Sequence, residues 1–116
     1  MPRTIAGKRL HPVGLGCMNV SWAYGTPPTH DECVRLLQQA VDLGYDHFDP
    51  ARIYGAGQNE SLLAEALKGR RDEVFIASKT GIVVDGPRRG VDCSPEYIAA
   101  AIDKSLALLG TDFIDL

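Results

Sequence analysis

The chain has 116 residues, 45% of them hydrophobic, and a formal net charge of −3. This length suffices for one small domain that buries roughly two-thirds of the surface its unfolded chain exposes. The acidic balance gives no basic field for nucleic acid, and no apolar run is long enough to predict a membrane span. No segment typical of a secretion signal opens the chain, so a soluble, cytoplasmic protein is expected.

The cysteines and histidines predict neither disulfides nor a metal site. The three cysteines are odd in number and lack CxxC spacing, so free thiols in a reducing compartment are expected. The three histidines are scattered along the chain. They lack the spacing of metal ligands, and no metal is expected.

The start of the chain predicts a hairpin and a buried strand. Residues 3–10, RTIAGKRL, place a Gly-Lys turn between two short runs, as a small hairpin does. The apolar run 13–18 predicts the first buried strand. It contains a Gly-Leu-Gly sequence, but Asn19 stands at the third glycine position of the dinucleotide-binding fingerprint. A Rossmann site is therefore not favoured.

A first helix is predicted from a cap and an apolar stripe. Thr29 and Glu32 form a capping box, and Gly44 is placed to end the helix. Apolar residues on one face of the helix predict its buried side. These are Cys33, Leu36, Leu37, Ala40 and Val41.

Two more helices follow the same rules. Apolar residues recur at helical spacing over 62–67, and Gly69 ends that helix. The last helix begins with Ser94 as N-cap and Pro95 at the first helical position, and it ends at Gly110. Its stripe comprises Ile98, Ala101, Ile102, Ser105, Leu106 and Leu109.

Three short runs, 47–51, 74–79 and 113–116, are predicted as further strands. Strands alternating with helices predict parallel pairing with right-handed crossovers. Residues 80–93 are rich in glycine and are expected to form a long loop beside the site. Arg88 and Arg89 in this loop could contact an anionic ligand, but the simpler interpretation is that both are solvated.

A carboxylate, a phenol and an amine are expected to meet at one end of the sheet. Asp49 lies near the end of one predicted strand and Lys79 closes the next. Neighbouring strands lie roughly 4.8 Å apart, and a buried ammonium needs a counter-charge, so the two side chains are expected to pair. Tyr54 follows in a glycine-containing loop. A cation beside a phenol favours the phenolate, so Lys79 is expected to make Tyr54 a stronger acid.

Four runs of the sequence resemble one known family. VGLGCMNVSWAYG, FDPARIYGAGQNE, VFIASKTG and GTDFIDL are similar to the N-terminal half of an aldo-keto reductase, most like the bacterial aryl-alcohol-dehydrogenase-like members. The resemblance covers nearly the whole chain. It implies an α/β fold in which residues 1–116 form the N-terminal half of a TIM (β/α)8 barrel, with a leading β-hairpin, about four parallel strands and three helices.

The resemblance also implies an activity, the NADPH-dependent reduction of small aldehydes or ketones to alcohols. The family's catalytic tetrad has Asp, Tyr, Lys and His, and three of these match Asp49, Tyr54 and Lys79. Met18, Asn19 and Asp49 are implied to contact the cofactor. Trp22 and Tyr54 are implied to contact the substrate.

Two departures from the family pattern stand out. Pro50 follows the aspartate where the family usually has Thr, which removes a backbone N–H and can re-aim the carboxylate. The family His and the segment that binds the adenosine phosphate come later than the last residue given. A truncated chain that binds cofactor weakly and turns over slowly is therefore expected.

Two alternatives remain open at this point. Lys79 could act as a Schiff-base nucleophile, with Asp49 and Tyr54 as acid-base partners, as in an aldolase. The chain could instead be a non-catalytic interaction module, because a half barrel exposes its sheet face and strand edges. Such a module is expected to self-associate or to pair with a complementary half barrel.

Overall fold

Three short parallel strands form the centre of the protein. In the computed structural model, which describes residues 3–116, the strand order is β3-β4-β5. Leu15 pairs with Phe48, and Phe48 pairs with Ile76, so apolar residues occupy the middle of the sheet. The bounds of the strands are Leu15–Gly16 for β3, His47–Asp49 for β4 and Phe75–Ile76 for β5.

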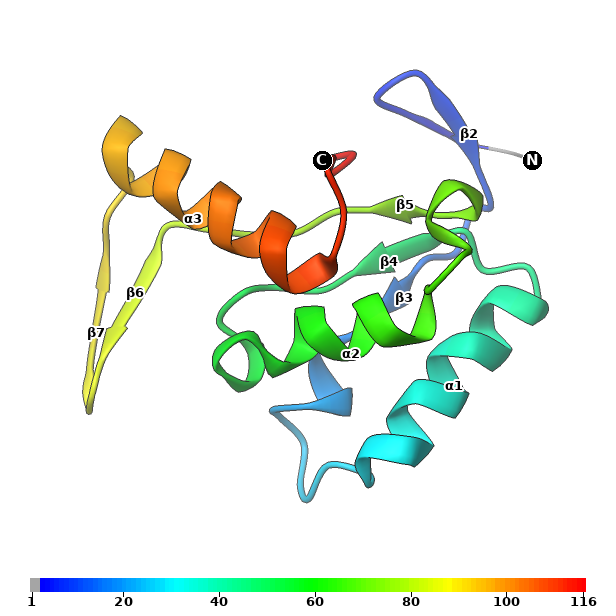
Figure 1. Ribbon diagram of the computed structural model, residues 1–116, viewed down its shortest axis with the longest axis horizontal. Helices are drawn as coiled ribbons and strands as arrows, with labels where there is room; N and C mark the ends of the chain where they lie inside the picture. The colour runs from blue at the N-terminus through cyan, green and yellow to red at the C-terminus, as the bar shows by residue number, and fades with distance from the viewer. Residues whose placement is uncertain (1–2) are drawn as a thin grey trace.

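Three helices connect and cover these strands (Figure 1). Their bounds are His30–Asp42 for α1, Gln58–Ala66 for α2 and Pro95–Leu109 for α3. The expected caps are present: Thr29 and Glu32 form the capping box of α1, and Ser94 accepts a hydrogen bond from the Tyr97 N–H. Gly110 closes α3 in a left-handed conformation that a side chain would disfavour.

The hydrophobic core lies between the sheet and the helices. Aromatic and branched side chains from all these layers exclude water there, which is the main stabilising contribution to a small domain. The largest fully buried side chains of this core are Phe48, Leu37, Leu62, Leu63 and Ile76, whereas the buried Phe75 ring lies against His47. Leu36 and Ile102 were expected in the buried stripes, but both are exposed. They lie at the margins of the covered faces of α1 and α3.

Two hairpins lie at opposite ends of the molecule (Figure 1). The first pairs β1 (Arg3–Ile5) with β2 (Lys8–Leu10), which confirms the expected hairpin, but its turn is Ala6–Gly7, one residue before the expected Gly-Lys turn. The second pairs β6 (Ile82–Asp85) with β7 (Arg88–Val91), where a long irregular loop was expected. The expectation was wrong because the residues on either side of the Gly-Pro turn pair in register, from Asp85 with Arg88 to Ile82 with Val91, and satisfy one another's backbone groups.

The segment expected as a fourth strand lies beside β5, and Leu116 pairs with it by backbone hydrogen bonds. The Asp115 and Leu116 N–H groups both donate to the Ile76 carbonyl, and Ser78 N–H donates to the Leu116 carbonyl. The Ile76 N–H is taken by the Asp115 side chain at 2.9 Å. The Asp115 side chain thus adds a further hydrogen bond to β5.

An ion-pair cluster at the amino end of the sheet holds this segment in place. The buried Asp115 carboxylate accepts hydrogen bonds from Lys8 and, at 2.8 Å, from Arg71. Burial opposes ionisation of Asp115, but these bonds and the one from the Ile76 N–H outweigh it and lower its pKa. Lys8 belongs to β2 and Arg71 to a short 3₁₀ turn, η3 (Arg71–Glu73). The cluster therefore joins the β1–β2 hairpin, the central sheet and residues 113–116.

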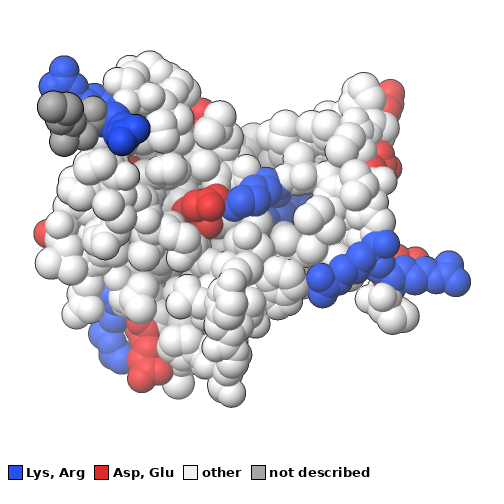
Figure 2. Space-filling model, turned by 180° about the vertical axis from the view of Figure 1, so that it is seen from behind, with Lys and Arg blue, Asp and Glu red and all other residues white. Residues whose placement is uncertain are grey.

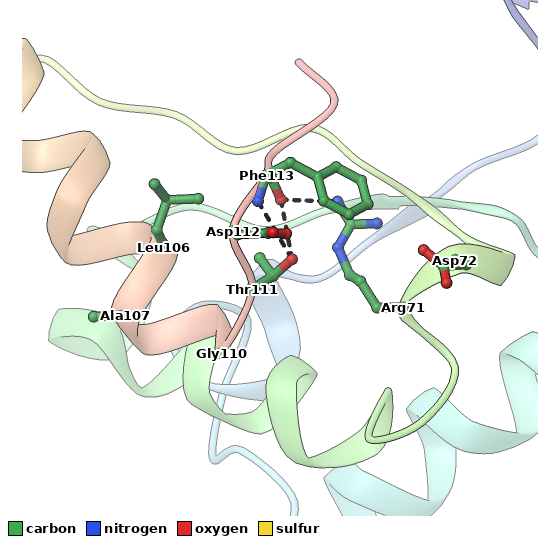
Figure 3. A pocket seen from close by; sticks show the side chains of 8 residues that line it. All are labelled: Arg71, Asp72, Leu106, Ala107, Gly110, Thr111, Asp112 and Phe113. Carbon is green, nitrogen blue, oxygen red and sulfur yellow. Dashed lines mark hydrogen bonds between the residues drawn. The ribbon is translucent and has the colours of Figure 1, made fainter.

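A shallow hollow of about 580 Å³ lies beside this cluster. Figure 3 shows Phe113 against Arg71, and the guanidinium carbon lies 3.9 Å from the ring centre. The Thr111 hydroxyl donates to the Phe113 carbonyl at 3.3 Å. These groups hold one another, and we assign this hollow no catalytic role.

Two classes of feature are absent from residues 3–116. No helix in this range has the length and apolar character needed to cross a bilayer. Nor does this part of the chain bring three or more His, Cys, Asp or Glu side chains together in a way that could hold a metal ion.

Candidate active site

Asp49 and Lys79 form an ion pair at the carboxyl end of the sheet. Asp49 is the last residue of β4, and Lys79 follows β5 by three residues. The Lys79 ammonium donates to the Asp49 carboxylate and, at 2.9 Å, to the Pro50 carbonyl. Both side chains are 46% exposed. The pair expected from the sequence is thus formed, but burial does not enforce it, because both groups remain in contact with water.

Tyr54 lies next to this pair. The Lys79 ammonium nitrogen is 5.4 Å from the centre of the Tyr54 ring. Tyr54 begins a 3₁₀ turn, η2 (Tyr54–Gly57), which leads directly into α2. Gly55, Ala56 and Gly57 all have positive φ values there, 60°, 54° and 101°. This left-handed stretch turns the chain sharply after Tyr54 and sets where the ring lies.

Trp22 also contacts Tyr54. The two rings are stacked with centroids 5.4 Å apart and planes 23° from parallel. Trp22 follows a second 3₁₀ turn, η1 (Met18–Val20), after β3. Arg89 of β7 places its guanidinium carbon 5.3 Å from the centre of the Trp22 ring. The β6–β7 hairpin therefore contributes directly to this end of the molecule.

These groups surround a cavity of about 600 Å³ at the carboxyl end of the sheet. The walls come from the loop after β3, the loop after β4, the segment after β5, the β6–β7 hairpin and the first turn of α3. They comprise Met18, Trp22, Ala51, Arg52, Ile53, Tyr54, Ala56, Lys79, Thr80, Ile82, Val83, Val84, Arg89 and Tyr97. Of the candidates for cofactor contact, Met18 lines this cavity, whereas Asn19 and Asp49 do not.

Two buried polar residues of α2 support the site, and the sequence did not single them out. Asn59 donates to the Cys17 carbonyl at 2.6 Å and to the Ser21 hydroxyl at 2.9 Å. Glu60 accepts a hydrogen bond of 2.6 Å from the hydroxyl of Ser78, the residue before Lys79. Both side chains are fully buried. Polar residues at a helix start usually face solvent, so only the fold shows that they tie α2 to the site.

Cys17 directly follows β3 and is hydrogen-bonded to the last residue of β4. Its backbone N–H donates to the Asp49 carbonyl at 3.1 Å. Burial raises the pKa of the Cys17 thiol to about 12, and burial also raises that of Cys33. Both thiols are therefore neutral, core-filling groups, whereas Cys93 is exposed.

Comparisons with known proteins point to one family. The sequence profile of the aldo/keto reductase family matches residues 12–116. An uncharacterized oxidoreductase of Bacillus subtilis, YqkF, is 38% identical over 106 residues, which cover 90% of this chain and 33% of YqkF. The chain spans about a third of the length of the curated relatives it matches.

Solved structures give the same picture. The holo form of aldo-keto reductase AKR11C1 from Bacillus halodurans matches with a TM-score of 0.85 and 31% identity, covering 97% of this chain and 37% of that one. An aldo-keto reductase from Klebsiella pneumoniae, solved in complex with NADPH, matches with a TM-score of 0.70 and 24% identity. That match covers 91% of this chain and 34% of the other, and it is a likeness of fold.

Proposed function

This chain belongs to the aldo/keto reductase family, and from that premise we propose that it takes part in the NADPH-dependent reduction of small aldehydes or ketones to alcohols. Members of the family are oxidoreductases, and the fold seen here is part of their TIM barrel. The observation that carries the proposal is the Asp49–Lys79 pair beside the Tyr54 ring.

In this proposal Tyr54 is the acid that protonates the carbonyl oxygen. Negative charge builds on that oxygen during reduction, and a proton donor held in place stabilises the transition state. Lys79 places its positive charge 5.4 Å from the Tyr54 ring centre, where it can stabilise the negative charge that develops in the transition state. Asp49 and the Pro50 carbonyl hold the ammonium in position. Solvent returns the proton to Tyr54, since the site is open to water.

The nicotinamide end of the cofactor fits the polar groups beside the cavity. Asn19 directly follows Met18 of the cavity wall and is exposed, and the Asp49 carboxylate uses only one oxygen to bind Lys79. These groups offer the donors and acceptors that an amide and a ribose need, with Met18 supplying an apolar contact. When bound, NADPH supplies the hydride that the carbonyl carbon accepts.

The hydrogen bonds of Lys79 favour the reductase proposal over the aldolase alternative. A Schiff-base nucleophile must present the free lone pair of its amine to a carbonyl carbon. Lys79 instead donates to a carboxylate and to a backbone carbonyl. That arrangement suits a fixed cation beside Tyr54.

Replacement of the phenol tests the proposal. We expect Tyr54→Phe to lower kcat for NADPH-dependent aldehyde reduction about 100-fold or more, measured in the protein expressed from its complete reading frame. Tyr24→Phe is the matched control, because Tyr24 lies in the neighbouring loop with 86% of its surface exposed. Equal activity of Tyr54→Phe and the wild type would contradict the proposal.

A further inference from the structure

We propose that the substrate carries a carboxylate, which Arg89 of the β6–β7 hairpin binds with help from Arg52, and that the protein reduces acidic carbonyl compounds. This inference rests on the proposed function and names its substrate class. It starts from the charge of the cavity walls, which differs in sign from the charge of the chain as a whole.

The walls of the cavity carry three cations and no acid. Arg52, Lys79 and Arg89 line it, whereas no Asp or Glu does. Lys79 is already paired with Asp49. Within residues 3–116, Arg52 and Arg89 form no salt bridge. The chain has a net charge of −3, so two unpaired guanidiniums in one cavity indicate a site for an anion.

Arg89 lies beside Trp22 and can bind a carboxylate through its N–H groups. Its guanidinium lies over the Trp22 ring, with 5.3 Å from the guanidinium carbon to the ring centre. Because Arg89 forms no salt bridge within residues 3–116, the N–H groups of its guanidinium remain available to a ligand. Two parallel N–H groups on one edge of a guanidinium match the two oxygens of a carboxylate. The arginine thus contacts the indole while its donors remain available.

The neighbouring arginine shows that this placement is specific. Arg88 pairs in register with Asp85 across the hairpin, and it does not line the cavity. Arg89 pairs with Val84, which lines the cavity as Arg89 does. Figure 2 shows basic side chains at the edge of the molecule that carries this hairpin. Of two adjacent arginines in the sequence, the strand directs one toward the site.

Arg89 and Tyr54 line the same cavity and lie beside the same indole, so a small substrate could approach both. Tyr54 and Arg89 both contact the Trp22 indole, with 5.4 Å and 5.3 Å to its ring. A ligand with one ring or a short chain between carbonyl and carboxylate could therefore approach both groups. Ile82, Val84 and Met18 line the same cavity and would contact its apolar body.

Binding can be measured without turnover, because Trp22 is the only tryptophan in the chain. The probes are terephthalaldehydic acid and its methyl ester, which differ in the negative charge of the carboxylate and in one methyl group. We expect the acid to change Trp22 fluorescence with about 10-fold tighter binding than the ester, as one or two charge-assisted hydrogen bonds give. Equal affinity for acid and ester would overturn the inference.

Matched variants assign the effect to Arg89. Arg89→Gln should abolish the preference for the acid, Arg52→Gln should reduce it, and Arg88→Gln should leave it unchanged. Circular dichroism checks that each variant is folded. A preference that survives in Arg89→Gln would overturn the inference. The inference would also be overturned if Arg89→Gln lost affinity for NADPH but still preferred the acid probe. Arg89 would then bind the phosphates of the cofactor.

The same variants separate this inference from the proposed function. If Arg89→Gln still reduces the ester with NADPH but no longer favours the acid, both proposals hold. If the acid binds through Arg89 but neither probe is reduced, the proposed function fails and the carboxylate site remains. Reduction of both probes at equal kcat/KM in wild type and Arg89→Gln would leave the proposed function standing and overturn the substrate class.

Discussion

The two ends of the central sheet use the same chemical pair in different ways. At the amino end, Asp115 is bonded to Lys8, Arg71 and the Ile76 N–H, and its side chain is 3% exposed. At the carboxyl end, Asp49 meets Lys79 with 46% of each side chain exposed.

The difference in burial indicates which pair contributes to stability and which is available for ligand chemistry. Removing one partner of a buried ion pair leaves a charge without solvent or counter-charge, which is strongly destabilising. An exposed pair adds little to stability, because water screens it. The amino end therefore holds the fold together, whereas the carboxyl end can devote its charges to a ligand. The predictions below test this separation of stability from chemistry.

The largest effect is expected at the carboxyl end, on activity alone. Lys79→Met removes the cation beside Tyr54 while keeping a side chain of similar length. We expect kcat for carbonyl reduction to fall about 100-fold or more, with the urea midpoint of unfolding nearly unchanged. Lys68→Met, at an exposed position after α2, is the control. A Lys79→Met variant that loses stability but keeps its activity would reverse the assignment of the two ends.

The converse is expected at the amino end. Asp115→Asn leaves Arg71 and Lys8 without their counter-charge, and we expect the free energy of unfolding to fall by about 3 kcal/mol. Glu65→Gln is the matched control, since the Glu65–His30 pair is exposed on both sides and should cost less than about 1 kcal/mol. Urea denaturation of both variants measures the contrast. Similar losses in the two would show that burial does not distinguish the pairs.

The Asp115 cluster also predicts how acid acts on stability. The pKa of Asp115 is held below its ordinary value of 3.8, mainly by hydrogen bonds from Lys8, Ile76 and Arg71 that outweigh burial. A carboxyl with a lowered pKa in the folded state contributes stability above its unfolded pKa and loses it as the pH falls. The difference in unfolding free energy between wild type and Asp115→Asn should therefore shrink below about pH 4. A difference independent of pH would rule out this linkage.

A smaller effect is expected from the turn that positions Tyr54. Gly55 has a φ of 60°, and an added Cβ would lie 3.1 Å from the Ser21 carbonyl oxygen. Gly55→Ala should cost about 1–2 kcal/mol of stability and should lower activity by moving Tyr54. Gly86→Ala is the control, with a φ of 56° but nothing within 4 Å of the added atom. Thermal unfolding and kcat of both variants separate backbone strain from the contact with Ser21.

Local signals in the sequence predicted much of the fold and the central pair of the site. Thr29, Ser94 and Gly110 act within one turn of a helix, so their effect is readable from adjacent residues. Asp49 and Lys79 could be brought together because parallel strands align their carboxyl ends. These inferences need only periodicity, caps and the direction of the strands.

The remaining features depend on contacts between distant parts of the chain. Glu60 is in a polar run typical of a surface, and only the packing of α2 buries it against Ser78. Arg89 reaches Trp22 only because residues 80–93 form a hairpin. The Asp115 cluster depends on Lys8 and Arg71, which lie far from Asp115 in the sequence.

The unequal burial of the three cysteines makes the hairpin accessible to chemical labelling. Cys17 and Cys33 are buried, and the pKa of each thiol is raised, so a maleimide should react with neither in the folded protein. Cys93 is exposed at the base of the β6–β7 hairpin. A single dye can therefore be attached to the unmodified sequence there, and its emission would report how this arm moves when a ligand enters.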